Sequence, residues 1–255
     1  MTLRGASIIE RNIALFLDVD GTLLEIAATP DAVKVPAALR NTLHLASGRE
    51  HGALALISGR CISELDRLFA PYVFAAAGQH GLERRDAKGK FMRPPIATDL
   101  LNPARAALVE LQMQHNGLLL EDKGTALALH FRLAPKLEPL VRASMAAIAA
   151  PLADRFIVRE GKCVLELAPS GISKRMAIQA FMSEFPFEGR VPVFVGDDVT
   201  DEDGFEAVND MDGYSIRVGA PSKTLARYGF SSVSAVVTWL RRRNLNRPPT
   251  VARLR

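Results

Sequence analysis

The sequence of 255 residues contains little cysteine, few aromatic residues and no apolar run long enough to span a bilayer. Its two cysteines, Cys61 and Cys163, are far apart, which argues against a disulfide framework and a CxxC metal site and favours a reducing compartment such as the cytoplasm. The N-terminal apolar stretch is short and broken by charged residues. We therefore expect no signal peptide, no transmembrane helix and no membrane partner.

Aromatic residues make up only 6% of the chain, although its net charge is +4 and much of the excess lies in the tail RRRNLNRPPTVARLR. Nucleic-acid surfaces usually interleave basic and aromatic side chains, and no such patch is present here. We interpret the tail as a solvated end and expect no nucleic-acid partner. A nucleic-acid binder stays open only as an alternative, whose weak affinity should collapse with salt.

Hydrophobic residues account for 48% of the chain, enough for one large core or a core with a smaller insert. Short continuous apolar runs alternate with helical patterns in the first part of the chain and again after residue 169. Such runs are typical of parallel strands buried on both faces, and their alternation with helices predicts an α/β doubly wound, Rossmann-like sheet. The runs that predict strands are 13–18, 53–58, 72–78, 191–196 and 214–219.

The character of the sequence changes between residues 97 and 168. The stretch 91–99, with its two prolines, is expected to be a linker. The patterns that follow predict the order α-β-β-α-β-β, which suits a small α+β sandwich with antiparallel strands. We therefore divide the chain into a core of 1–96 and 169–255 and an inserted α+β domain of 97–168.

Polar side chains follow several of the predicted core strands. Ligands of open α/β sheets bind outside the carboxyl ends of the strands, so these side chains should converge there. Crowded carboxylates repel one another unless a cation lies between them, and hard oxygen ligands favour Mg²⁺. A lysine and a hydroxyl nearby would suit a phosphoryl group, so the cluster indicates phosphoryl chemistry. Its members are Asp18, Asp20, Ser58, Lys174, Asp197, Asp198 and Asp201.

Each of these short patterns has a purely structural interpretation when it stands alone. A DxD is usually a turn or a helix cap, SGR is a common strand-to-helix turn, and an acidic run suits a helix N-terminus. The stretch DVDGTL also lacks the later acidic position of a calcium-binding loop. Their succession at the ends of apolar strands is a much rarer coincidence, and it favours the functional interpretation.

The patterns together resemble the haloacid dehalogenase (HAD) superfamily, and more closely its trehalose-6-phosphate phosphatases. The core motifs are DVDGT at 18–22, Ser58 in ISGR, Lys174 in GISKR and GDDVTD at 196–201. The segment GQHGLERRD at 78–86 and the stretches LEDKGTALALHFR at 120–132 and GKCVLEL at 161–167 are similar to further motifs of that family, the last two in its cap. The family cap has the α-β-β-α-β-β order expected above. Arg175 departs from the pattern, since a glycine commonly follows the motif lysine.

The resemblance implies a mechanism and a cofactor. Asp18 would be the nucleophile that forms an aspartyl-phosphate, and Asp20 the general acid and then the base. Ser58 and Lys174 would hold phosphoryl oxygens. The implied Mg²⁺ ligands are Asp18, Asp20, Asp197, Asp198 and Asp201. The implied substrate is trehalose 6-phosphate, and we expect a monomer.

The resemblance also implies a substrate-binding set, with Glu121 and Glu166 favouring this family over other sugar phosphatases. A solvated sheet face with cross-strand ion pairs is the structural alternative for the cap residues. Two functional alternatives stay open: a HAD phosphatase acting on another sugar phosphate, and a catalytically silent binding fold. The expected substrate-binding residues are Asp18, Asp20, Gly21, Ser58, Arg60, Gln79, His80, Gly81, Glu121, Lys123, Arg132, Lys162, Glu166 and Glu202.

Overall fold

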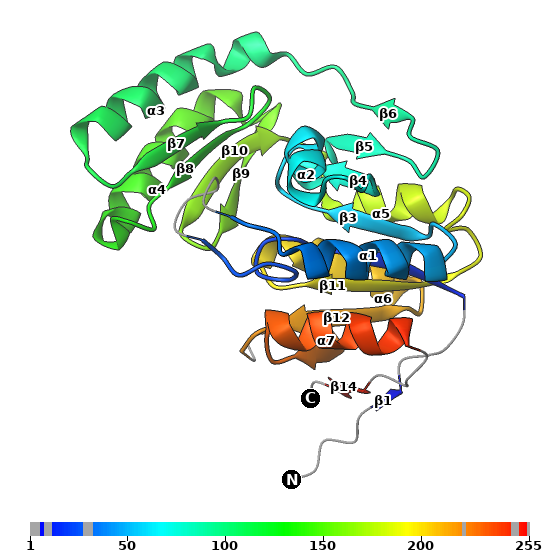
Figure 1. The fold of residues 1–255 in the computed structure, drawn as a ribbon. Helices are drawn as coiled ribbons and strands as arrows, with labels where there is room; N and C mark the ends of the chain where they lie inside the picture. Colours follow the sequence, from blue (N-terminus) through cyan, green and yellow to red (C-terminus); the bar gives the residue numbers. More distant parts are fainter. Residues whose placement is uncertain (1–5, 8–11, 28–32, 221–222, 246–249, 254–255) are drawn as a thin grey trace. The chain divides into compact units, whose positions relative to one another are not determined.

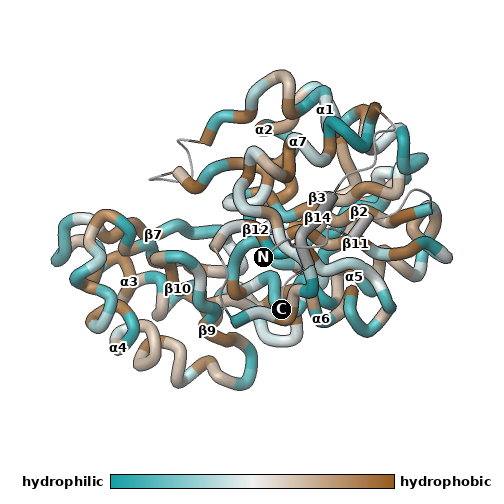
Figure 2. The backbone as a smooth tube through the Cα atoms, turned by 90° about the horizontal axis from the view of Figure 1, so that it is seen from below, coloured by the Kyte–Doolittle hydropathy of each residue, from teal (hydrophilic) through white to brown (hydrophobic). Residues whose placement is uncertain are grey.

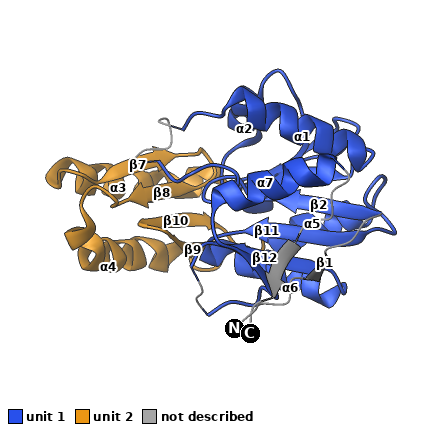
Figure 3. Cartoon of the chain, turned by 60° about the horizontal axis from the view of Figure 1, so that its bottom comes forward, with its two compact units in different colours: residues 1–93, 173–255 blue, residues 94–172 orange. Residues whose placement is uncertain are grey.

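The structure, a computed structural model, describes residues 6–7, 12–27, 33–220, 223–245 and 250–253. Residues 94–172 form one compact unit, and the described residues on either side of that segment form the other (Figure 3). The expected insert, 97–168, lies inside this smaller unit, which includes a few more residues at each end.

The larger unit is built on one mixed sheet. Its described strands follow the order β1-β14-β13-β12-β11-β2-β3-β4-β5-β6. The central strands from β13 to β4 are parallel, and antiparallel pairs extend the sheet at both edges. The strand bounds are β1 Ala6–Ser7, β2 Ile13–Leu17, β3 Leu54–Ile57, β4 Ala75–Gly78, β5 Glu83–Arg85, β6 Phe91–Met92, β11 Val191–Gly196, β12 Tyr214–Val218, β13 Tyr228–Phe230 and β14 Thr250–Arg253.

Helices cover both faces of this sheet, because the central strands are apolar on both sides. In β2, Leu15 and Leu17 pack with residues of α1, α2 and α7, whereas Phe16 packs on the other face with residues of α5 and α6. Figure 1 shows α1 and α7 lying side by side on one face. The bounds are α1 Ala37–Arg49, α2 Ile62–Phe69, α5 Lys174–Met182, α6 Glu202–Asp210, α7 Val233–Asn244, and the short 3-10 helices η2 Gln79–Gly81 and η6 Val199–Asp201.

The smaller unit is a two-layer α+β sandwich. Its antiparallel sheet has the order β7-β8-β10-β9, and one face is covered by α3 and α4. Leu127, Leu129 and Leu165 point into that apolar layer. The bounds are η3 Thr98–Leu101, α3 Asn102–Gln114, β7 Leu119–Asp122, β8 Leu127–His130, η4 Pro135–Leu137, α4 Glu138–Ala149, η5 Ala150–Leu152, β9 Phe156–Gly161 and β10 Val164–Pro169.

The fold class expected from the sequence is confirmed, including the α-β-β-α-β-β order of the insert. The central strands of the larger sheet are among the hydrophobic segments of Figure 2. Because these strands are buried on both faces, their residues form continuous apolar runs that predict strands from the sequence. The short antiparallel edge strands were missed. Within the stretch expected to be a linker, Phe91 and Met92 form β6 and pair with Arg85 and Arg84. Strands of two or three residues are too short to carry a periodic apolar signal.

Among the described helices, none combines the length and the apolar character needed to cross a membrane.

Candidate active site

The parallel strands bring the polar side chains named above to one edge of the larger sheet. In the register of β2 with its neighbours, Leu17 lies opposite Val195 of β11 and Leu56 of β3. The residues that follow these three positions therefore emerge at the same carboxyl edge. The backbone N–H of Asp18 donates to the carbonyl of Val195 at 2.9 Å, which fixes the first aspartate beside the end of β11.

Three carboxylates meet at this edge and are almost completely shielded from solvent. Asp18, Asp197 and Asp201 each place a carboxylate oxygen within 4.8 Å of the other two, and none is more than 5% exposed. Two glycines make the approach possible. A Cβ on Gly21, whose φ is +89°, would lie 2.1 Å from an oxygen of Asp197, and one on Gly196 would lie 2.5 Å from Cγ of Asp201.

Lys174, the first residue of α5, supplies the balancing positive charge. Its ammonium group donates to Oδ1 of Asp18 at 2.8 Å and to Oδ1 of Asp201 at 2.6 Å. Burial by itself would lower the pKa of Lys174, but attraction to the two carboxylates outweighs it and raises the pKa above the ordinary value. Burial raises the pKa of Asp18, with Lys174 acting in the opposite direction. The site therefore holds a permanent cation beside a carboxylate whose charge needs further compensation.

The donor set suits a divalent metal ion. Three buried carboxylates and one ammonium group leave an excess of negative charge that cannot be stable without a further cation or a proton. All available donor atoms are hard oxygens, which select hard cations. The described residues thus provide a divalent cation site at the carboxyl edge of the sheet.

Asp198 and Asp201 of GDDVTD differ in where they place their carboxylates, and of this pair only Asp201 belongs to the cluster. Asp198 accepts from the N–H of Val199 at 2.8 Å and so begins η6. Asp201 accepts from the N–H groups of Asp197 and Asp198 at 2.8 and 2.9 Å, which positions the end of β11. Asp198 is therefore part of the turn, and Asp201 is the carboxylate that enters the cluster.

Asp20 is held by a bidentate ion pair. Its two carboxylate oxygens accept from Nε and Nη2 of Arg60 at 2.7 and 2.8 Å. The Arg60 side chain is only 10% exposed, and it also lies 3.8 Å from Glu64, one helical turn further along. A planar guanidinium holds a carboxylate in a defined orientation, so Arg60 fixes the direction of the Asp20 side chain.

Ser58 and the turn at residues 79–81 lie against each other. Oγ of Ser58 accepts from the backbone N–H of Arg60 at 3.1 Å, and its carbonyl accepts from the N–H of His80 at 2.9 Å. A Cβ on Gly59 would lie 2.7 Å from Nε2 of His80, so the imidazole packs directly on that peptide. The amide of the buried Gln79 donates to Glu83 at 3.2 Å.

Two further residues expected at the substrate have structural contacts here. A Cβ on Gly81, whose φ is +110°, would lie 2.7 Å from the carbonyl of Ser173, so a glycine is needed where the turn meets the start of α5. Glu202 accepts from Arg217 at 3.1 Å, from the Thr224 hydroxyl at 2.8 Å and from the N–H of Leu225 at 2.7 Å. Its carboxylate therefore holds the segment after β12.

The smaller unit has one polar sheet face, opposite the face covered by its helices. Glu121 of β7 and Glu166 of β10 both lie opposite Ala128 of β8, so they share one row across the sheet. Lys123 donates to Glu166 at 2.9 Å, and Nε2 of His130 lies 2.8 Å from Glu121. Although burial raises the pKa of Glu121, its hydrogen bond to His130 and the charge of Lys123 bring that pKa below the ordinary value.

The two other residues expected to bind substrate in this unit lie outside this row, in the turns after β8 and β9. Arg132 follows β8 in a turn and donates to the carbonyl of Lys162, an exposed residue between β9 and β10, at 2.6 Å. Two residues on the same face were not assigned from the sequence. His130 pairs with Glu121, and Arg159 lies opposite Glu166 and donates to the carbonyls of Pro169 and Ile172. A period of two along β8 and β9 was the signal that could have found them.

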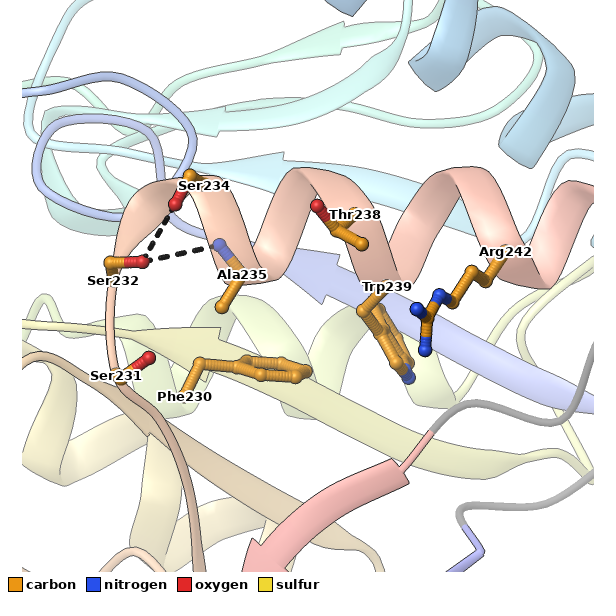
Figure 4. A pocket seen from close by; sticks show the side chains of 8 residues that line it. All are labelled: Phe230, Ser231, Ser232, Ser234, Ala235, Thr238, Trp239 and Arg242. Atoms are coloured by element: carbon orange, nitrogen blue, oxygen red, sulfur yellow. Dashed lines mark hydrogen bonds between the residues drawn. The ribbon is translucent and has the colours of Figure 1, made fainter.

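A separate hollow of about 330 Å³ lies where β13 meets α7 (Figure 4). The Ser232 hydroxyl begins α7 by accepting from the N–H of Ala235 and lies 2.9 Å from the Ser234 hydroxyl. Among the described residues that line the hollow, none belongs to the carboxylate cluster. Those residues are Phe230, Ser231, Ser232, Ser234, Ala235, Thr238, Trp239 and Arg242.

The chain is similar to several known proteins. A family model described as trehalose-phosphatase matches residues 16–233. The chain is 44% identical over 227 residues to trehalose-6-phosphate phosphatase of Escherichia coli K12, covering 89% of this chain and 85% of that protein. It is 43% identical to a probable trehalose-phosphate phosphatase of Sinorhizobium fredii, covering 82% and 79%. Among solved structures, the C-terminal domain of C. albicans trehalose-6-phosphate phosphatase has the same fold, with a TM-score of 0.83, 22% identity and coverage of 91% and 93%.

Proposed function

The chain belongs to the trehalose-phosphatase family, and we propose that it hydrolyses trehalose 6-phosphate to trehalose and phosphate. The observation that carries this proposal is the buried contact of Lys174 with Asp18 and Asp201 at the carboxyl edge of the sheet. An ammonium group beside a buried carboxylate can hold a phosphoryl dianion next to a nucleophile.

Asp18 is the proposed nucleophile. One of its carboxylate oxygens attacks phosphorus, the bond from phosphorus to the sugar oxygen breaks, and an aspartyl-phosphate forms. The residue follows β2 directly, and its backbone is hydrogen-bonded to β11, so the carboxylate is attached to a rigid part of the sheet. Rigid placement matters because small displacements of reacting groups strongly reduce the rate.

Asp20 is the proposed acid and base. It gives a proton to the departing sugar oxygen, and it then takes a proton from the water that attacks the aspartyl-phosphate. That second step releases phosphate and restores the carboxylate of Asp18. The bidentate contact of Arg60 orients the Asp20 carboxylate for the second step, in which it accepts a proton. Two proton transfers in opposite directions can be served by one carboxyl group because the first step leaves it as a carboxylate.

Ser58 and Lys174 are proposed to bind the non-bridging phosphoryl oxygens, with the backbone of Gly21 and the turn at His80 and Gly81 completing the site. The family implies a divalent metal, and we propose Mg²⁺, held by Asp18, the backbone carbonyl of Asp20, and Asp197. Asp201, and Asp198 more remotely, would support these ligands through hydrogen bonds. The cation, when bound, offsets the negative charge of the phosphoryl group.

The polar sheet face of the smaller unit is proposed to recognise the sugar. Glu121, Lys123 and Glu166 combine carboxylate acceptors with an ammonium donor in one row. Such groups suit the many hydroxyls of a disaccharide, each of which can donate and accept. Arg132 and Lys162 extend the set at the far turn. The same contacts would also stabilise an ordinary sheet face, and substitution of Glu166 distinguishes the two roles.

We further propose that the protein works as a monomer in the cytoplasm. Its two free cysteines, Cys61 and Cys163, suit a reducing compartment. Sedimentation analysis at several concentrations would test the monomer, and a dimer that persists on dilution would contradict it.

The decisive experiment measures phosphate release from a panel of sugar phosphates, each with and without Mg²⁺. We expect a strong magnesium-dependent preference for trehalose 6-phosphate. Comparable release from many sugar phosphates would retain the proposed chemistry of Asp18 and overturn the proposed substrate. No release from any of them by folded, metal-loaded protein would overturn the catalytic proposal and favour a binding role.

A further inference from the structure

Glu83, the first residue of β5, is a buried carboxylate that the proposed chemistry does not use. It is 6% exposed and receives hydrogen bonds at both oxygens. The backbone N–H of Ile62 donates to Oε2 at 2.9 Å, and the Gln79 amide and the Arg93 guanidinium donate to Oε1 at 3.2 and 3.3 Å. A carboxylate is expensive to bury, and these donors are what stabilise it in this place.

The turn that Glu83 contacts has an unusual backbone. Gln79 and His80 have φ values of +49° and +58°, in the left-handed region that residues with a Cβ rarely adopt. Two such residues in succession persist only when their surroundings hold them. The Gln79 side chain, which is 5% exposed, has its amide on Glu83, so this carboxylate is a direct restraint on the turn.

The same turn supports the loop that carries Ser58 and Arg60. The N–H of Gln79 donates to the carbonyl of Arg60, and the N–H of His80 donates to the carbonyl of Ser58, both at 2.9 Å. Glu83 also contacts the residue that follows this loop, because it accepts from the N–H of Ile62, the first residue of α2. One carboxylate therefore links the turn to the segment 58–62.

We propose that Glu83 is a positioning residue for phosphoryl transfer, which rests on the proposed function. It holds the turn of Gln79 and His80 in its left-handed conformation. That turn fixes the positions of Ser58 and Arg60. Ser58 is the proposed phosphoryl ligand, and Arg60 orients Asp20. Loss of the restraint displaces both groups, and displacements of this kind reduce the rate of the chemical step more than they weaken substrate binding.

The test is the Glu83→Gln substitution. It keeps the shape of the side chain but replaces one of the two oxygens that accept hydrogen bonds in wild type with an NH₂ group. We expect kcat of the folded enzyme to fall about 10- to 100-fold, by a similar factor for trehalose 6-phosphate and for p-nitrophenyl phosphate. A kcat within about twofold of wild type in folded E83Q would overturn the proposal.

The matched control is Glu50→Gln, another buried carboxylate, which is 3% exposed and paired with Arg243 at 2.9 Å. It joins the C-terminal ends of α1 and α7, and its substitution should lower the unfolding temperature without changing kcat of the folded protein. Equal losses of kcat in E50Q and E83Q would show that Glu83 contributes stability alone, and would overturn the positioning role.

A second variant separates the turn from the buried charge. Gln79→Met removes the amide donor and leaves Glu83 paired with Ile62 and Arg93. The proposal therefore remains testable with this variant if E83Q does not fold. We expect kcat of Q79M to fall, and E83Q to add less than about threefold in that background, because residues acting through one contact are not additive. An unchanged kcat in Q79M, or fully multiplicative losses in the double variant, would overturn the proposed path through Gln79.

Binding of inorganic phosphate in the presence of Mg²⁺, measured by calorimetry, needs no turnover. We expect about tenfold weaker binding to E83Q than to wild type or E50Q, because Ser58 is displaced. Wild type that binds phosphate but hydrolyses no sugar phosphate would overturn the proposed function and not this inference. Equal affinities in all three proteins would overturn this inference alone.

Discussion

The ammonium group of Lys174 lies 2.8 Å from a carboxylate oxygen of Asp18, and both side chains are buried at the carboxyl edge of the sheet. These residues are 156 positions apart in the chain. The helix α5 begins at Lys174, and β2 ends just before Asp18, so two rigid elements fix the contact. This contact holds the proposed nucleophile and the proposed phosphate-binding cation side by side before substrate arrives.

Asp18→Asn should abolish turnover and leave the fold intact. The amide has nearly the shape of the carboxylate and cannot attack phosphorus, so we expect kcat to fall by at least about 10³-fold. Phosphate release and the thermal unfolding midpoint would be measured on the same preparation. Substantial activity in this variant would exclude Asp18 as the nucleophile.

Asp197→Asn should remove the response of the protein to Mg²⁺. Metal binding to the native state alone raises the unfolding temperature, and Asp197 is a buried member of the carboxylate cluster. We expect wild type to show a magnesium-dependent rise that the variant lacks, and a chelator to remove activity from wild type. The control is Asp203→Asn, an exposed aspartate of α6, which should keep the rise. An equal rise in D197N would place the metal elsewhere.

Glu166→Ala should separate sugar recognition from phosphoryl chemistry. The carboxylate lies on the polar face of the smaller unit and is paired with Lys123. We expect kcat/KM for trehalose 6-phosphate to fall about 10- to 100-fold, as for a lost hydrogen bond to a charged group. Hydrolysis of p-nitrophenyl phosphate should change less than about threefold, because that ester has no sugar to recognise.

The control for this variant is Glu160→Ala. Glu160 is on the neighbouring strand β9, opposite Leu165 of β10. Its side chain pairs with Arg142 of α4. It should leave both activities near the wild-type values. Equal losses on the two substrates in E166A would remove the recognition role.

Glu121→Gln should destabilise the protein in a pH-dependent way. The pKa of Glu121 is lowered in the folded state because His130 and Lys123 favour its carboxylate, despite burial. A lowered pKa contributes stability above the unfolded pKa, and that contribution is lost as the pH falls through the folded pKa. We expect E121Q to be about 1 kcal/mol less stable at pH ~5.5, a gap that shrinks toward pH ~3.5 in denaturant titrations. A gap that widens at acid pH would contradict the shift.

Local patterns were sufficient for much of the fold and for the meeting of Asp18, Asp197 and Asp201 at one edge of the sheet. The continuous apolar run before Asp18 and the acidic stretch after Val195 predict strand ends, and in a parallel sheet such ends share one edge. The edge strands β5 and β6 were beyond this reasoning, because the pairing of β5 with β4 and of β6 with β5, and not an apolar period, makes them strands.

The partners of individual carboxylates were decided only by tertiary packing. DxD and GDDVTD indicate a cluster, but they do not say that Asp201 joins it while Asp198 begins η6. Glu83 is one charged residue among several in GQHGLERRD, and two of its three donors, Ile62 and Arg93, are brought to it by other segments. Chain-local periodicity determines where strands and helices begin. Which distant donor a buried carboxylate meets is determined by how those elements pack, because burial makes an unpaired charge too costly to keep.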